Sequence, residues 1–122
     1  MYEEGDIKST VINYLESKGY KVWKTGEYPL TIGSYRRFPD IFAKKAEKSI
    51  VIECKGGSSA RFYSVIDALG QVLAIKAHYP EFDVVIAVPS TWGEDCLSRR
   101  IRKTYSVKLW LVNPELRLVF EV

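Results

Sequence analysis

The sequence predicts a single α/β domain in which helices flank a mixed central β-sheet. The chain has 122 residues, enough to bury one hydrophobic core. Helical and strand-like patterns follow one another as helix, three strands, helix, strand, helix and two strands. No repeat, low-complexity tract or linker-like stretch divides the chain, so residues 1–122 are expected to form one unit.

The first third of the chain predicts one helix and one strand. Apolar residues recur at helical spacing from Ile7 to Leu15, and Gly19 follows as a candidate C-cap. Alternation of polar and apolar residues predicts a strand over about 20–27. Proline and glycine within residues 28–37 predict a loop or an irregular strand there.

The middle third predicts a hairpin, a helix and a buried strand. Two short apolar runs, "RFPDIFAKK" and "SIVIECKG", are separated by a polar segment, as in a β-hairpin. "SSARFYSVIDALGQVLAIKAHYP" has a broad apolar face at helical spacing, and Ser58 or Ser59 is its candidate N-cap. "FDVVIAVPS" is continuously apolar, as in a strand buried on both faces. This order predicts a right-handed crossover that adds a parallel strand to an antiparallel meander.

The last third predicts a short helix and two closing strands. "TWGEDCLSRRIRKT" is expected to be helical, with Leu97 and Ile101 on its buried side. "VKLWLV" and "LRLVFEV" are expected to be strands on either side of a turn at Asn113 and Pro114.

Composition excludes some classes of protein and permits others. No apolar run approaches the roughly 20 residues of a membrane span, and the polar start of the chain differs from a signal peptide. Cys54 and Cys96 have neither metal-ligand spacing nor the number needed for a disulfide framework, which favours free thiols in the cytoplasm. The net charge of +3 permits a nucleic-acid partner without requiring one.

Charged residues interrupt the apolar run "SIVIECKG". Because side chains alternate along a strand, Glu53 and Lys55 are expected to point to one face and Cys54 to the other. An unpaired charge in apolar surroundings is costly, but a divalent cation would stabilise a carboxylate there. Asp40, on the preceding strand of the hairpin, is expected to reach the same cation.

These residues resemble the motif of the PD-(D/E)xK nucleases. Pro39 and Asp40, twelve intervening residues and then Glu53-Cys54-Lys55 match PD-x12-ExK. The resemblance covers about residues 3–89 and implies the restriction-endonuclease-like αβββαβ core of this superfamily, which includes restriction enzymes and Holliday-junction resolvases.

The resemblance also implies a role for each motif residue. Asp40 and Glu53 would bind Mg²⁺ or Mn²⁺, with the backbone carbonyl of Cys54 as a third protein ligand. Lys55 would orient the attacking water or help to deprotonate it, and would offset charge at the phosphate. Such a set suits Mg²⁺, which binds one or two carboxylates together with substrate phosphate oxygens.

Two further catalytic positions follow from the family pattern. A first-helix glutamate often joins the site, and Glu4 fits because it shares a helical face with Ile7, with Glu3 as the alternative. Glu4 is equally well explained as an acid at the start of a helix, where negative charge is stabilising, with no catalytic role. Some family branches carry Q-x-x-x-Y in the second helix, and here Gln71 is present but Ile75 replaces the tyrosine.

Basic residues and one Ser-rich turn are candidates for DNA contact. Each also has a simpler interpretation, as a solvated helix face or as a turn with an N-cap. The candidates are Arg36, Arg37, Ser58, Ser59, Arg61, Arg99, Arg100, Arg102 and Lys103.

Together these patterns predict a Mg²⁺-dependent deoxyribonuclease that acts on double-stranded or branched DNA. One cutting centre per chain favours a homodimer for double-strand cleavage, with Trp110 and Phe120 near its face. The alternative is a nucleic-acid-binding or assembly protein that retains the fold without catalysis.

Overall fold

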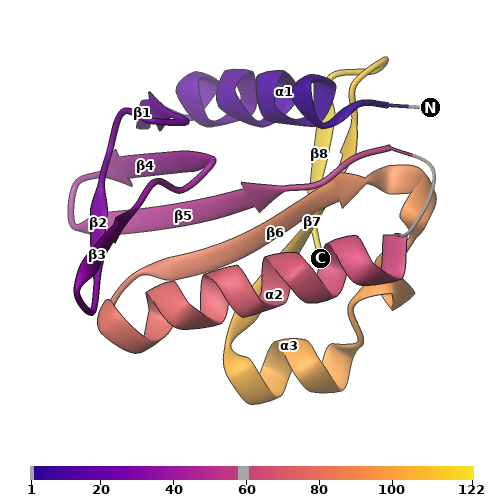
Figure 1. Ribbon diagram of the computed structural model, residues 1–122. Coiled ribbons are helices and arrows are strands. Elements are labelled where there is room, and N and C mark those ends of the chain that lie inside the picture. Colours follow the sequence, from indigo (N-terminus) through magenta and orange to yellow (C-terminus); the bar gives the residue numbers. More distant parts are fainter. Residues whose placement is uncertain (1, 58–60) are drawn as a thin grey trace.

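A six-stranded mixed sheet lies between helical layers in the computed structural model, which describes residues 2–57 and 61–122 (Figure 1). The strand order is β1-β4-β5-β6-β7-β8. These strands are β1 (Lys21–Lys24), β4 (Ile41–Lys45), β5 (Lys48–Cys54), β6 (Asp83–Pro89), β7 (Val107–Asn113) and β8 (Leu118–Glu121). Among the described residues, no helix is both long and apolar enough to cross a membrane.

The direction of the strands confirms the predicted crossover. β1, β4 and β5 pair antiparallel, β5 and β6 pair parallel, and β6 and β7 also pair parallel. β7 and β8 close the sheet as an antiparallel pair. The helix between β5 and β6, α2 (Arg61–His78), makes the connection that a parallel pair requires.

Helices cover both faces of the sheet. α1 (Glu4–Ser17) buries Ile7, Val11 and Leu15 against one face. α2 and α3 (Arg99–Tyr105) lie on the other side (Figure 1), where Val72 and Ile75 of α2 are fully buried. Since the sheet is covered on both faces, its central strands are apolar on both sides, as the run "VVIAV" predicted.

Two segments differ from their predicted structure. Residues 28–37 form a separate hairpin of β2 (Leu30–Ile32) and β3 (Tyr35–Arg37), because Gly33, at φ +62°, permits a tight turn. The predicted helix of residues 91–104 is wrong in its first half. There the chain forms 3₁₀ turns at Ser90–Trp92 and Glu94–Cys96, interrupted by Gly93 at φ +75°, and α3 begins only after Ser98 caps it.

The register of the β4–β5 hairpin prepares the functional site. Ile41 pairs with Ile52, so Asp40, which precedes β4, lies at the end of β5 that carries Glu53. The predicted alternation is confirmed, because Ile52 and Cys54 pack in the α1 layer whereas Val51 packs in the α2 layer.

Candidate active site

Glu53 is a buried carboxylate at the end of β5. It is only 2% exposed, and its nearest basic group is the Arg37 guanidinium, with Nη2 lying 3.6 Å from Oε1. Among the described residues, Oε1 has no hydrogen-bond partner. Burial, followed by repulsion from Asp40, raises the pKa of Glu53 to about 8. The site therefore holds a carboxylate whose charge the surrounding protein does not fully stabilise.

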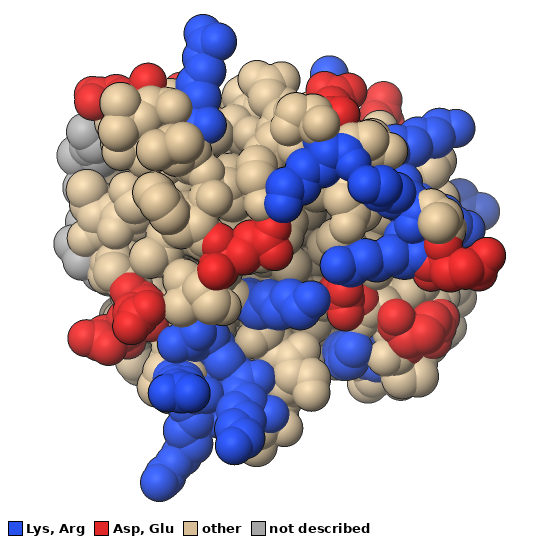
Figure 2. Space-filling view, turned by 180° about the vertical axis from the view of Figure 1, so that it is seen from behind, with Lys and Arg blue, Asp and Glu red and all other residues tan. Residues whose placement is uncertain are grey.

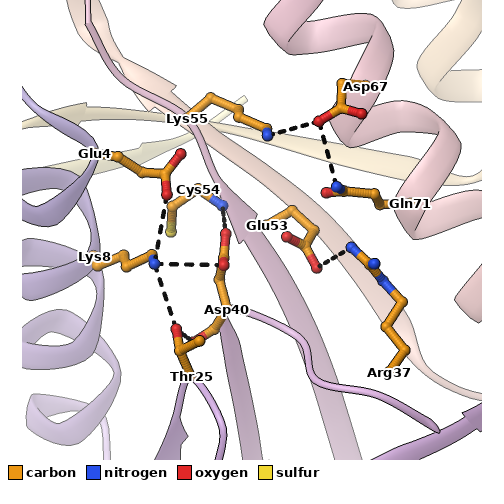
Figure 3. A network of polar contacts seen from close by, with 10 residues as sticks. All are labelled: Glu4, Lys8, Thr25, Arg37, Asp40, Glu53, Cys54, Lys55, Asp67 and Gln71. Carbon is orange, nitrogen blue, oxygen red and sulfur yellow. Dashed lines mark hydrogen bonds and ion pairs between the residues drawn. The ribbon is translucent and has the colours of Figure 1, made fainter.

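Asp40 lies beside Glu53 and is better supported (Figure 3). Its Oδ2 accepts a hydrogen bond of 2.8 Å from the backbone N–H of Cys54, and its Oδ1 is 3.5 Å from the Lys8 ammonium. The backbone carbonyl of Asp40 accepts from the hydroxyl of Thr25 at 3.0 Å. These contacts fix Asp40 at the junction of β4, β5 and α1.

Helix α1 contributes Glu4 and Lys8 to the same place. The Lys8 ammonium lies 3.5 Å from both Glu4 Oε2 and Asp40 Oδ1, and it donates to Thr25 at 3.4 Å. Partial burial lowers the pKa of Lys8, but Asp40 and Glu4 raise it more, so the net shift is upward. Lys8 is thus a cation that links the predicted helix carboxylate to Asp40 (Figure 3).

Gly56 permits this approach of α1. A Cβ at Gly56 would lie 2.6 Å from the backbone nitrogen of Glu4 and 2.8 Å from the carbonyl carbon of Glu3. The next residue, Gly57, donates its N–H to the carbonyl of Tyr2 at 2.7 Å. The start of α1 therefore packs directly on the chain that leaves β5, which brings Glu4 to the site.

Gly56→Ala is expected to separate the start of α1 from β5. The added methyl group meets backbone rather than a flexible side chain, so we expect destabilisation of about 1–3 kcal/mol, the usual range for overpacking. Urea unfolding measures the effect. Gly5→Ala, in the first turn of α1, is the control, because its Cβ would meet no described atom within 4 Å beyond its chain neighbours and the nearby backbone of its own helix. Equal stability of the two variants would contradict the close approach.

On the α2 side, Asp67 connects two of the predicted residues. Its Oδ2 accepts from the Lys55 ammonium at 2.9 Å and from the Gln71 side-chain amide at 3.3 Å. Gln71 Oε1 is buried and, within residues 2–57 and 61–122, has no hydrogen-bond partner. Lys55, Asp67 and Gln71 thus form one network on the Glu53 side of the sheet (Figure 3).

Lys55 is expected to keep its proton. Partial burial lowers its pKa, but the hydrogen bond and charge of Asp67 raise it more, and the net shift is upward. The Lys55 ammonium therefore suits stabilisation of negative charge on an oxygen rather than removal of a proton.

The Cys54 side chain is not a nucleophile in this setting. The residue is fully buried in the α1 layer, and burial raises the pKa of its thiol well above the ordinary value. Its backbone N–H contacts Asp40, so residue 54 does lie at the site. The use of its carbonyl as a metal ligand stays a prediction.

The predicted DNA-contacting residues do not form one surface. Arg37 turns toward Glu53, and Arg36 is exposed on β3, a strand of the separate hairpin and not the one that follows Asp40. Arg61 begins α2, while Ser58 and Ser59 lie outside the described residues.

The basic residues of α3 lie apart from the candidate site. Figure 1 shows α3 on the far side of α2 from α1, and Figure 2 shows a gathering of Lys and Arg side chains at the lower left, where α3 lies. Arg99, Arg100, Arg102 and Lys103 belong to this helix, and Arg102 donates to the carbonyl of Leu97 at 3.0 Å. Their contact with DNA stays a prediction.

A groove opens between α2 and the β2–β3 hairpin. Its volume is about 350 Å³, and Arg37, Asp67 and Gln71 lie along it together with the exposed Tyr35. Because Arg37 also forms an ion pair with Glu53, this groove adjoins the carboxylates.

The acids near β5 do not form a complete metal cage. In the part of the chain that the structure describes, no group of three or more Asp, Glu, His or Cys side chains is arranged to hold an ion. Asp40 and Glu53 form a two-carboxylate pair, which is the protein contribution that Mg²⁺ commonly uses when phosphate and water oxygens complete its coordination.

Two residues of the site, Lys8 and Asp67, were missed by the motif. Lys8 follows Glu4 by four residues, and Asp67 precedes Gln71 by four, so each shares a helix face with a predicted residue. Applying the helical repeat to Glu4 and Gln71 would have found both.

Comparison with solved structures shows other proteins with this fold. An XisH family protein from Nostoc punctiforme gives a TM-score of 0.73 at 21% identity, covering 94% of this chain and 96% of that one. An fdxN element excision controlling factor from Anabaena variabilis gives 0.74 at 20% identity, covering 95% and 96%. A protein of unknown function designated AF1548 gives 0.57 at 15% identity, covering 85% of this chain and 56% of that one.

These similarities confirm the predicted fold class, a mixed central sheet flanked by helices. At such identities they carry the fold alone. No family model and no curated protein sequence matches the chain.

Proposed function

We propose that this protein is a metal-dependent nuclease that hydrolyses phosphodiester bonds in DNA. The observation that carries the proposal is the paired placement of Asp40 and Glu53, with Glu53 buried, its pKa raised and its Oε1 without a hydrogen-bond partner among the described residues. A fold built only for stability would gain nothing from two adjacent carboxylates in this position. A metal-binding role would account for the unfavourable burial and mutual repulsion of these two carboxylates.

The donor set fits a hard divalent cation. Asp40 and Glu53 would hold Mg²⁺ or Mn²⁺, with the Cys54 carbonyl as the further backbone ligand that the sequence resemblance implies. Bound there, the ion would supply Lewis-acid activation of a water and of the scissile phosphate.

The other residues of the site would bind and orient the substrate. The Lys55 ammonium, held by Asp67, would stabilise charge on a phosphate oxygen. Arg37 pairs with Glu53 and also lines the groove. Once a cation neutralises Glu53, the Arg37 guanidinium would be free to bind a phosphate of the DNA backbone instead. Lys8 would hold Asp40 in place through its contact with Oδ1.

The experiment is a cleavage assay on linear, circular, single-stranded and branched DNA. Mg²⁺ or Mn²⁺ is expected to support cleavage and EDTA to abolish it, with activity returning when metal is added back. Asp40→Ala, assayed beside the unaltered protein, separates this activity from a contaminating nuclease. Absence of cleavage on every substrate, or cleavage that survives in EDTA, would reject the proposal.

A second candidate function is DNA binding or assembly without catalysis. It is favoured by the ion pairs inside the site, because Lys8 and Arg37 already lie 3.5 Å and 3.6 Å from the two motif acids. One protein of the same fold is described as controlling excision of the fdxN element. DNA binding that is unchanged by EDTA, without cleavage, would support this second function.

A further inference from the structure

The groove beside the two carboxylates holds polar atoms that the folded chain leaves unpaired. It lies between α2 and the β2–β3 hairpin and has a volume of about 350 Å³. Gln71 Oε1 and Arg37 Nε, both from residues that line it, are buried and have no hydrogen-bond partner among the described residues. Buried polar atoms are nearly always paired, so an acceptor and a donor left open in one groove indicate a ligand that completes them.

The orientation of the Gln71 amide is fixed by its neighbour. Its Nε2 donates to the Asp67 carboxylate at 3.3 Å, and an ionised carboxylate only accepts, so the amide oxygen Oε1 is the group left for a ligand. The Gln71 side chain lies between Asp67 and the Arg37 guanidinium (Figure 3). The groove therefore offers an acceptor on its α2 side and a guanidinium on its hairpin side.

The rim of the groove presents an aromatic ring beside open space. Tyr35 and Arg37 are two residues apart on β3, so both face the groove, and Tyr35 is 62% exposed. On α2, Ile66 is 47% exposed, and a Cβ at Gly70 would meet no described atom within 4 Å beyond its own helix and chain neighbours. A flat ligand therefore has both a surface to stack on and room to enter.

The hairpin is held against α2, so the groove is formed before any ligand binds. The backbone N–H of Thr31 on β2 donates to the hydroxyl of Tyr79, just beyond the end of α2, at 3.0 Å. Leu30 and Ile32 of the same strand are buried in the core that α2 covers. A preformed groove lowers the entropy cost of ordering a ligand.

We propose that this groove binds one unpaired nucleotide of DNA, with its base stacked on Tyr35 and the edge of that base donating to Gln71 Oε1. Every DNA base has an N–H group on its Watson–Crick edge, so Gln71 accepts from any of them and does not select a sequence. The phosphate of the nucleotide binds Arg37. This inference rests on the proposed function, since it takes DNA as the substrate and adds which form of DNA is bound.

The size of the groove and the burial of Gln71 Oε1 favour an unpaired base over a duplex. A volume of about 350 Å³ is near the lower end of the roughly 300–1,000 Å³ of pockets that hold small molecules, so the groove admits a nucleotide but not a double helix. Inside a duplex the base edges are paired and the base faces are stacked on one another, so neither Tyr35 nor Gln71 reaches its target. Asp67 also lines the groove and repels phosphate, which favours the base rather than the backbone on the α2 side.

The test is DNA binding in EDTA, measured by fluorescence anisotropy with a labelled single strand and with the same strand annealed to its complement. The unaltered chain is expected to bind the single strand at least about tenfold more tightly than the duplex. Tyr35→Ala is expected to weaken single-strand binding about tenfold, the effect of losing one base–aromatic stack, and to leave duplex binding unchanged. Tyr35→Phe keeps the ring and should bind like the unaltered chain. A fluorescent base analogue in the strand should be quenched on binding to every chain except Tyr35→Ala.

Two further variants test the specificity of this effect. Tyr105→Ala is the matched control, because Tyr105 is 50% exposed at the end of α3 and does not line the groove. It should leave single-strand binding unchanged. Gln71→Leu removes the acceptor and should lower the affinity for the single strand but not for the duplex. Circular dichroism checks that each variant is folded.

Several results would overturn the inference. They are absence of single-strand binding, affinity for the duplex that equals or exceeds that for the single strand, and a Tyr35→Ala variant that binds the single strand as well as Tyr105→Ala does. Cleavage decides the proposed function separately. Single-strand binding through Tyr35 without any cleavage would keep the groove and reject the nuclease, whereas cleavage without single-strand preference would keep the nuclease and reject the groove.

Discussion

Glu53→Gln is expected to abolish metal-dependent cleavage while making the metal-free protein more stable at pH 8. Loss of a carboxylate that binds the cation should lower the cleavage rate about 1,000-fold, the upper end of effects seen when one charge-stabilising group is removed. The stability should rise because the glutamine side chain carries no charge that must be buried beside Asp40. Single-turnover cleavage and urea unfolding in EDTA measure the two effects.

Asp40→Ala should show the same loss of cleavage with the opposite change in stability. It leaves the buried N–H of Cys54 without its acceptor and removes a partner of Lys8, which should destabilise by about 1–3 kcal/mol. Glu47→Gln, at an exposed position in the β4–β5 turn, is the matched control and should change neither property. If Glu53→Gln proved as destabilising as Asp40→Ala, the unfavourable burial of charge assigned to Glu53 would be wrong.

The metal-free protein is expected to lose stability as pH rises from about 5 to 8. In the folded state the pKa of Glu53 is about 8, raised by burial and by Asp40 from an ordinary 4.5. Between these values the folded chain holds a proton that the unfolded chain has released, so raising the pH favours unfolding. At about 1.4 kcal/mol per pH unit, the loss reaches on the order of 4 kcal/mol when pH passes the folded-state value.

Mg²⁺ should reverse this loss. A cation held by Asp40 and Glu53 favours their ionised forms, so the stabilisation by Mg²⁺ should be larger at pH 8 than at pH 5.5. Thermal unfolding across this range, in EDTA and in Mg²⁺ at matched ionic strength, measures both curves. The pH dependence and the Mg²⁺ effect should both shrink in Glu53→Gln. A wild-type curve that overlays that of Glu53→Gln would exclude an unfavourable charge at Glu53.

The charges of the site show what tertiary packing adds to a motif. The motif located Asp40, Glu53 and Lys55, because strand alternation and hairpin pairing are set by local sequence. It did not show that Lys8 neutralises Asp40, nor that Asp67 holds Lys55. Those partners come from helices, and their reach depends on how each helix packs on the sheet.

The sequence misled where one residue broke a pattern. The run of residues 91–104 has helical spacing, but Gly93 adopts a positive φ and splits it into 3₁₀ turns and a short helix. The run "RFPDIFAKK" predicted that the chain at Arg36 and Arg37 continues into the strand that follows Asp40. They belong instead to a hairpin closed by Gly33, which turns Arg37 back onto Glu53.

By itself the sequence determined the fold class and the position of the paired acids. Hydrophobic periodicity is a local property, and it states which face of each element is buried. Only the tertiary structure decided which atoms meet across those buried faces. The absence of a side chain at Gly56 lets α1 approach β5, and that approach brings Glu4 and Lys8 to Asp40. Close packing of backbone on backbone fixes such distances, and a pattern of apolar residues along the chain does not record them.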